Sequence, residues 1–244
     1  MSLDVVIPCG PNDEDIIQKC VESVRNFVLG VRNIYIVSSR PLVVNGAEVF
    51  PESIFPFTKD DVAKHVKDTR AGWYLQQLLK LYAPLVIPNC LPDCLILDAD
   101  VILFKRIKFK DGQKYLFQKL HETHPPYFSH MKRLHPSFLP AFPRTSGIVN
   151  LMIFNTNILK ELFKEVEDFH KEFFWKVFLQ QVGPTEFSGA SEYEIYFHYI
   201  FRKHPQICSL RTLRFDNFGL RSNIQPGDWH YVTYHHHYQK NKKI

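Results

Sequence analysis

Short apolar runs alternate with amphipathic segments in the first part of this chain. Leu3–Pro8 and Asn33–Ser39 are apolar and β-branched, as buried strands are, and turn-forming residues follow the first of them. Between them, Asp13–Val28 has apolar residues at helical spacing. Its predicted buried face consists of Ile16, Ile17, Cys20, Val24 and Phe27. A strand, a helix and a second strand predict a right-handed βαβ unit, which begins many nucleotide-binding α/β sheets.

Asp68–Ala83 predicts a helix with two unlike faces. One stripe is apolar and consists of Ala71, Leu75, Leu78, Leu79 and Tyr82. The opposite stripe consists of Arg70, Trp73, Gln77 and Lys80. We expect the helix to end before Pro84, because a proline disfavours helical conformation in the residue before it. The polar stripe is either a solvated face or the border of a pocket, and Trp73 favours a pocket because tryptophan is unusual on a solvated stripe.

The second half of the chain continues the alternation of strands and helices. Gly147–Asn155 predicts a buried strand, Ser191–Lys203 a helix and Trp229–Tyr238 a late aromatic strand. Leu159–Gln180 predicts one long amphipathic helix whose packed side holds Phe173, Phe174, Trp175 and Phe178. The fold class we predict is therefore α/β, with one Rossmann-like domain over residues 1–244 and a mostly parallel central sheet flanked by helices.

Two acidic residues interrupt the apolar run Leu95–Phe104. Such a run predicts a strand that is buried on both faces of the sheet, where a charge is costly unless a partner or a metal ion compensates it. Asp98 and Asp100 are two strand steps apart, about 6.5 Å, and are expected to point the same way. The pair therefore suits a divalent cation that carries phosphate oxygens.

Composition and charge exclude some classes of protein. Hydrophobic residues make up 45% and charged residues 23% of the 244 positions, as in ordinary globular proteins. The formal net charge of +5 fits an anionic ligand, but the chain lacks the dense basic stripe of a nucleic-acid-binding protein. No apolar stretch reaches the roughly 20 residues of a membrane span, and Met1–Asp4 does not resemble a signal peptide. We expect a cytoplasmic protein with no nucleic-acid partner, no membrane span and five scattered, reduced cysteines.

The aspartate pair has three interpretations. It could be a solvated strand end or a structural calcium site, although its neighbours are strongly apolar. It could carry the nucleophile of a haloacid-dehalogenase-type phosphatase, but roughly 90 residues precede it, whereas that motif follows the first strand of such a domain. The third interpretation is a nucleotide-sugar site, in which a bound cation stabilises the departing diphosphate.

Four motifs in this order resemble those of glycosyltransferases of the GT-A fold. They are Arg70–Lys80, Leu97–Asp100, Ser188–Tyr196 and Tyr234–His235. The chain is similar to the small enzymes of bacteria and of large DNA viruses of algae, some of which transfer xylose. The resemblance extends from about Leu3 to Tyr238. It implies a nucleotide-sugar-binding half over about residues 1–104 and an acceptor-binding and catalytic half over about residues 105–244. If the protein is virus-encoded, the expected compartment is the cytoplasm of the host.

The resemblance also implies a set of site residues. Asp100 would bind a metal ion directly, and Asp98 would join it through the ribose or a metal-bound water. His235 would be a further ligand, with His236 and His237 as alternatives. An imidazole among carboxylates favours Mn²⁺ over Mg²⁺. The nucleotide sugar would lie against Pro8, Gly10, Arg70, Trp73, Gln77 and Asp98, with Arg70 able to pair with phosphate.

Two glutamates at the start of the last predicted helix are candidates for a catalytic base. Ser191 and Glu194 match a capping box, in which the Glu194 carboxylate bonds back to the Ser191 amide. This leaves Glu192 as the first choice for the base that deprotonates an acceptor hydroxyl, and Glu194 as the second. The function we expect is metal-dependent transfer of a sugar from a UDP-sugar to a glycan or glycoconjugate with inversion. The resemblance favours xylose as that sugar. A phosphatase-like hydrolase and a non-catalytic sugar-nucleotide-binding module remain as alternatives.

Overall fold

A computed structural model describes residues 2–66, 70–183, 188–217 and 227–235. The strands are β1 (Leu3–Pro8), β2 (Val31–Ser38), β3 (Glu48–Pro51), β4 (Asp93–Leu97), β5 (Val101–Leu103), β6 (Lys110–Asp111), β7 (Lys114–Gln118), β8 (Leu151–Asn155), β9 (Cys208–Arg211), β10 (Phe215–Asp216) and β11 (Tyr231–Thr233). The helices are α1 (Ile17–Phe27), α2 (Lys59–His65), α3 (Ala71–Val86), α4 (Pro125–Leu134), α5 (Thr156–His170), α6 (Phe174–Gln180) and α7 (Glu192–Lys203). Two 3₁₀ turns, Glu52–Ile54 and Pro205–Ile207, complete these elements.

A mostly parallel sheet of five strands, in the order β3-β2-β1-β4-β8, forms the centre of the fold. The central strand β1 is buried throughout and pairs in parallel with both β2 and β4, whereas β8 is antiparallel to β4. The predicted α/β class and the opening βαβ unit are therefore confirmed. The chain leaves β1 toward β2 on one side and reaches β4 on the other, so the sheet has a topological switch point between β1 and β4.

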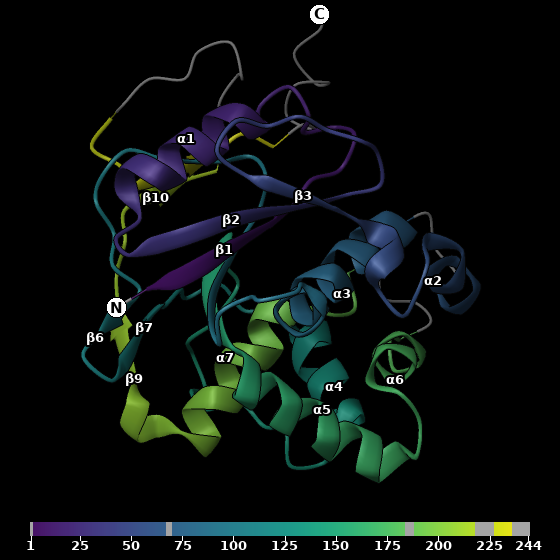
Figure 1. The fold of residues 1–244 in the computed structure, drawn as a ribbon. Helices are drawn as coiled ribbons and strands as arrows, with labels where there is room; N and C mark the ends of the chain where they lie inside the picture. Colours follow the sequence, from purple (N-terminus) through teal and green to yellow (C-terminus); the bar gives the residue numbers. More distant parts are fainter. Residues whose placement is uncertain (1, 67–69, 184–187, 218–226, 236–244) are drawn as a thin grey trace, which may run out of the picture.

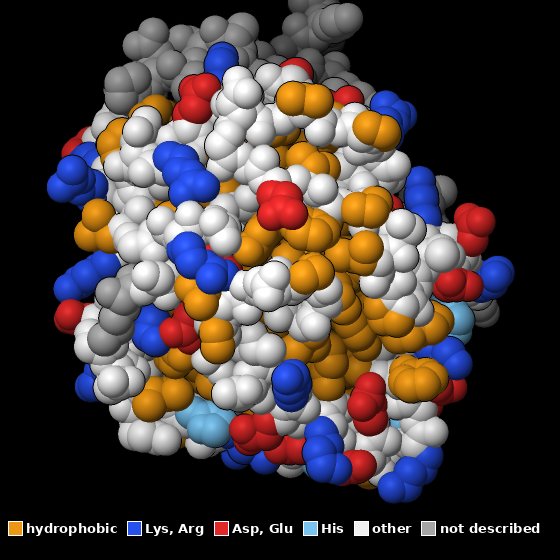
Figure 2. Space-filling model, viewed as in Figure 1, with side chains coloured by type: hydrophobic (Ala, Val, Ile, Leu, Met, Phe, Trp, Pro, Cys, Tyr) orange, Lys and Arg blue, Asp and Glu red, His pale blue; other side chains and the backbone are white. Residues whose placement is uncertain are grey.

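Helices cover both faces of this sheet. Figure 1 shows α1 on one side and α3, α4, α5 and α7 on the other. In the same view, Figure 2 shows hydrophobic side chains gathered over the region of β3 and α3, with most charged side chains around them. Because β8 comes from the second half of the chain, the central sheet combines segments from both halves. The division into a donor half and an acceptor half stays a prediction.

The expected continuous strand over 95–104 is wrong in one respect. The chain turns at Asp98–Asp100, where the Val101 amide donates to the Asp98 carbonyl at 3.2 Å. After the turn, β5 joins a different three-stranded sheet and pairs antiparallel with β11. The two aspartates therefore do not lie on one strand face, and the alternation rule does not set the direction of their side chains.

Two helix predictions also need correction. The helix α3 continues through Pro84 to Val86, because near the end of a helix a proline costs few backbone hydrogen bonds and the Ile87 amide still reaches Ala83 at 3.0 Å. The predicted long helix over 159–180 is two helices, α5 and α6, since Lys171 adopts a left-handed conformation with φ of 58°. Phe173 lies between them and is 62% exposed rather than packed.

The predicted positions of several elements are confirmed. The strand Leu3–Pro8 and the helix after Ser191 have the expected positions, and the apolar face of α1 is buried apart from the partly buried Phe27. All five cysteines are free thiols. Within the part of the chain that the structure describes, no helix is both long enough and apolar enough to cross a membrane.

A buried histidine on α4 makes the stability of this fold depend on pH. His130 is fully buried, and its Nε2 donates to the Phe178 carbonyl at 2.8 Å. Burial lowers the pKa of His130 to about 4. Between pH 6.5 and 4 the unfolded chain therefore binds a proton that the native state rejects, so the free energy of unfolding falls as the pH falls.

We predict that His130→Gln, which keeps a donor, reduces this loss. Between pH 7 and 5 the wild-type protein should lose about 2 kcal/mol more of its unfolding free energy than the variant. Urea denaturation at the two pH values measures the difference. Equal losses in both proteins would contradict the assignment.

Candidate functional site

A cavity of about 750 Å³ lies where β1 and β4 end, next to the switch point of the sheet. Parallel α/β sheets bind ligands at this place, beyond the carboxyl ends of their strands. The cavity is lined by all but one of the described residues that the sequence assigned to binding, metal coordination or base catalysis, namely Pro8, Gly10, Arg70, Trp73, Gln77, Asp98, Asp100, Glu192 and His235. Only Glu194, the second choice for the base, does not line it. The alternative ligands His236 and His237 lie outside the described residues.

Asp100 is held toward the late histidine. His235 Nδ1 donates to Asp100 Oδ2 at 2.9 Å, because β5 and β11 run side by side and the Tyr234 amide donates to the Asp100 carbonyl at 3.0 Å. Burial lowers the pKa of His235, but the hydrogen bond to Asp100 and the charge of Asp100 raise it by more than burial lowers it. The net shift of the His235 pKa is therefore upward. The other oxygen, Asp100 Oδ1, is buried and has no hydrogen-bond partner among the described residues.

Asp98 faces a lysine instead. Its Oδ1 forms an ion pair with Lys80 and accepts a weaker hydrogen bond from Gln76 at 3.5 Å. Burial raises the pKa of Asp98 to about 6, and the neighbouring ammonium opposes this rise. The two aspartates therefore have separate partners, as the turn between β4 and β5 requires.

Lys80 joins two carboxylates from distant parts of the chain. Its side chain is only 5% exposed, and its Nζ lies 2.7 Å from Glu192 Oε1 in addition to its ion pair with Asp98. The ammonium also lies 4.5 Å from the centre of the Tyr193 ring. Burial alone would lower the pKa of Lys80, but the two carboxylates outweigh burial and raise it well above its usual value. The Lys80 amine is therefore protonated, and its positive charge compensates the charges of both carboxylates.

Glu192 is in the first turn of α7, where Ser191 caps the helix by accepting from the Glu194 amide at 3.3 Å. The Glu192 amide donates to Gln77 Oε1 at 3.1 Å, which ties the start of α7 to α3. Gln77 Nε2 is buried and has no partner among the described residues. The polar stripe of α3 thus lines the cavity, with Gln77 and Lys80 buried and the other two residues half-buried.

The expected capping box is only half formed. The Glu194 carboxylate does not return to the Ser191 amide, and bonds instead to Ser146, Gly147 and His198. Glu194 is fully buried behind the cavity wall, so it is not placed to accept a proton from a substrate.

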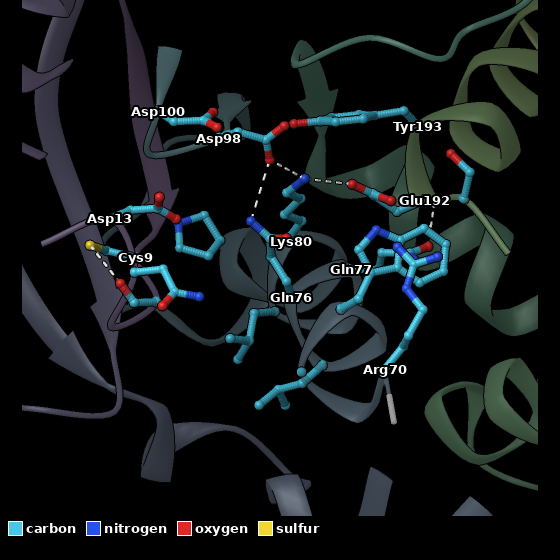
Figure 3. A pocket seen from close by; sticks show the side chains of 18 of the residues that line it. Cys9, Asp13, Arg70, Gln76, Gln77, Lys80, Asp98, Asp100, Glu192 and Tyr193 are labelled. Carbon is cyan, nitrogen blue, oxygen red and sulfur yellow. Dashed lines mark hydrogen bonds and ion pairs between the residues drawn. The ribbon is translucent and has the colours of Figure 1, made fainter. Parts of the chain in front are cut away.

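The cavity has two ends that Lys80 separates (Figure 3). Cys9, Asp13 and Asp100 lie at one end, after β1 and β4, and Glu192 and Arg70 lie at the other. Arg70 bonds to Ser188 and lies 4.2 Å above the Trp73 ring.

Sequence reasoning missed several residues of this site. Lys80 was placed on the correct stripe of its helix, but its position between Asp98 and Glu192 follows only from the packing of α3 against α7. Gln76 reaches Asp98, and Tyr127 lines the cavity, where burial raises its pKa to about 12. The one sequence signal for these residues was the position of Lys80, which lies at helical spacing from Trp73 on the same stripe of α3.

The chemistry of the site suits a divalent cation at the Asp100 end. Among the described residues, no group of three or more His, Cys, Asp or Glu side chains forms a metal site by itself. Asp100 and His235 nevertheless provide adjacent oxygen and nitrogen donors, and the orphaned Asp100 Oδ1 has a lone pair to offer. The residues present therefore fit a metal ion that shares its coordination with a bound anion.

Comparisons of the sequence and of the structure show which known proteins this chain is similar to. A sequence model described as a family of unknown function (DUF6492) matches residues 6–239. A search of the curated proteins gives no match. Among the solved structures that match is mouse xyloside xylosyltransferase 1 in its apo form, which is 12% identical, with a TM-score of 0.48 over 96% of this chain and 97% of that chain.

We predict that Lys80→Met strongly destabilises the protein, because it leaves Asp98 and Glu192 as two buried carboxylates without a cation. Removal of one partner from a buried ion pair costs about 3–5 kcal/mol. Chemical denaturation at pH 7 measures this loss, and a second substitution, Glu192→Gln, should restore part of it. Lys164→Met, which breaks an exposed ion pair with Asp168, is the matched control and should hardly change the midpoint. If both lysine variants lose similar stability, the buried pairing is not the cause.

Proposed function

This chain belongs to the DUF6492 family of unknown function, and we propose that it is a glycosyltransferase acting on a nucleotide-diphosphate sugar. The observation that carries the proposal is the buried Asp98–Lys80–Glu192 array beside the Asp100–His235 pair, at the switch point of a nucleotide-binding type of sheet. Such an array offers a charged carboxylate for acid–base chemistry and a place for an anionic leaving group in one cavity.

The donor nucleotide would occupy the end of the cavity that follows β1. Pro8 and Gly10 lie there, where α/β sheets receive the base and ribose. We propose UDP as the nucleotide and xylose as the sugar, in keeping with the sequence motifs. Asp98 would contact the ribose or a metal-bound water, since its other contacts are to Lys80 and Gln76. Gln77, Trp73 and Arg70 would border the sugar and its phosphates.

Asp100 and His235 would hold the metal ion, with Asp98 nearby as a further acid. A mixture of carboxylate and imidazole favours Mn²⁺, with Mg²⁺ as the alternative. When bound, a divalent cation would neutralise the charge that develops on the departing diphosphate.

Glu192 would act as the base. It would take the proton from an acceptor hydroxyl of a glycan or glycoconjugate as that oxygen attacks the anomeric carbon, which gives inversion. Lys80 holds the Glu192 carboxylate in place through the ion pair at 2.7 Å. In a retaining reaction Glu192 would not act as this base, whereas the Asp100–His235 pair would keep its function. The cytoplasm, or that of a host, is the compartment we propose.

A thermal-shift experiment tests the class of function. We predict that a UDP-sugar stabilises the wild-type protein only with Mn²⁺, by about 2.7 kcal/mol at 100 times the dissociation constant. Asp100→Asn should abolish this shift and leave the melting temperature without ligand near that of the wild type. Asp168→Asn, a surface substitution on α5, is the control and should keep the shift.

The same experiment separates the alternatives. A non-catalytic module would bind the sugar nucleotide without hydrolysing or transferring the sugar, and a phosphatase would release phosphate from small esters. A full metal-dependent shift in Asp100→Asn would contradict the assigned metal site.

For the base, we predict that Glu192→Gln lowers turnover of the sugar nucleotide by about 10²–10⁴-fold, because an amide cannot accept the proton. Affinity for UDP with Mn²⁺ should stay within about twofold, since Glu192 lies at the other end of the cavity and Lys80 keeps Asp98 as a partner. Steady-state kinetics and calorimetric titration with UDP measure the two quantities. Equal losses of turnover and affinity would indicate a structural role for Glu192.

A further inference from the structure

Glu194 is the centre of a buried polar cluster just outside the cavity. Its Oε2 accepts from Ser146 Oγ at 3.0 Å and from the Gly147 amide at 2.6 Å. Its Oε1 accepts from His198 Nε2 at 3.3 Å. The Glu194 and His198 side chains are both fully buried. The cluster thus ties the first two turns of α7 to the segment that precedes β8.

The hydrogen bonds around His198 fix its protonation. The Ala141 amide donates to His198 Nδ1 at 3.0 Å, so this nitrogen carries no proton and Nε2 carries the only one. Glu194 therefore faces three donors, of which the Gly147 and His198 N–H groups cannot become acceptors. A carboxylate, which accepts at both oxygens, satisfies all three donors at once.

The segment that Glu194 holds is part of the wall of the site. Gly147 packs so closely on α7 that an added Cβ would collide with Phe197 and lie 3.1 Å from the Tyr193 carbonyl. The next residues, Ile148 and Val149, line the cavity. The Asn150 carbonyl then accepts from the Asp98 amide at 3.0 Å.

The cluster therefore links the two halves of the proposed site. Two residues before Glu194, α7 carries Glu192, and the held segment ends at the backbone of Asp98. Between these points Lys80 forms ion pairs with both acids, so the distance from α7 to the end of β4 decides whether both pairs can exist together.

We propose that Glu194 is a positioning residue, whose carboxylate clamps the 146–149 wall to α7 and so sets where Glu192 stands relative to Asp98 and Lys80. This role rests on the proposed glycosyltransferase function. It differs from the base role considered for Glu194 from the sequence, because the carboxylate acts through the wall and never touches the substrate.

A glutamine cannot take the place of this carboxylate. If its oxygen accepts from Gly147, its NH₂ group faces His198 Nε2–H, and if it is turned over, the NH₂ group faces Gly147. The first arrangement sets two donors against each other at His198, whose Nδ1 accepts from the Ala141 amide, and the second sets them against each other at the wall itself. The nucleotide end of the cavity, around Asp100 and His235, has no part in this cluster.

Three measurements on Glu194→Gln test the proposal, with a UDP-sugar and Mn²⁺ as the probes. We expect kcat for hydrolysis of the UDP-sugar to fall about 10- to 100-fold, because small displacements of catalytic groups cost that much. The Kd of UDP with Mn²⁺ should stay within about twofold. Amide hydrogen exchange, read by mass spectrometry, should become faster over residues 141–150 and stay unchanged in β1 and β4.

Two further variants complete the test. Ser146→Ala removes one of the three donors but leaves the carboxylate, so it should lower kcat less than Glu194→Gln does. If Glu194→Gln does not fold, the kcat and the amide exchange of Ser146→Ala test the proposal in its place. Glu165→Gln is the matched control, because Glu165 also joins α7, through Tyr199 at 2.9 Å and Lys203 at 2.7 Å, but lies outside the cavity wall. Its kcat should equal that of the wild type.

The proposal is overturned if Glu194→Gln keeps its kcat within about twofold of the wild type, or if exchange over 141–150 does not change. A parallel loss of UDP affinity and of protection in β1 and β4 would overturn it as well, since it would show a general structural role. A wild-type protein that neither binds UDP with Mn²⁺ nor hydrolyses any sugar nucleotide would instead overturn the proposed function itself.

Discussion

The ammonium of Lys80, buried between Asp98 and Glu192, is the interaction on which the candidate site depends. Three charged groups have left water here, and each would be costly alone, because the penalty for burying an unpaired charge is several kcal/mol. The arrangement is tolerated because α3, β4 and α7 bring one cation within reach of both acids. A hydrophobic substitute could serve stability as well, so the burial of three charges beside a cavity supports the chemical role that we propose for them.

The turn at Asp98–Asp100 decides how the two ends of the cavity differ. A strand that continued straight would present both carboxylates to one face, whereas the turn sends β5 into a second sheet beside β11. Asp100 thereby meets His235, which is 135 residues later in the chain, and Asp98 is left to Lys80. One end of the cavity offers an imidazole and a carboxylate oxygen that has no partner among the described residues, and the other end offers a carboxylate held by a cation.

Predictions from the pattern succeeded where the physical signal was local. The strand Leu3–Pro8, the apolar face of α1 and the cap at Ser191 follow from periodicity and capping chemistry within a few residues. They failed at Pro84, which lies near the end of α3 where a proline costs few hydrogen bonds, and at the break near Lys171, which has no glycine or proline to mark it. The capping box failed because partners distant in sequence, Ser146 and Gly147, together with His198 take the Glu194 carboxylate.

The sequence by itself determined the α/β class, the βαβ beginning and the identity of nine of the residues that line the cavity, because buried periodicity and misplaced charges are visible in a single chain. The tertiary structure decided which of these residues face one another. It gave Lys80 its two acids, separated Asp98 from Asp100 and moved Glu194 out of the cavity. These outcomes depend on contacts between α3, β4, β11 and α7 that lie far apart in sequence, and no local pattern encodes the distances between such elements.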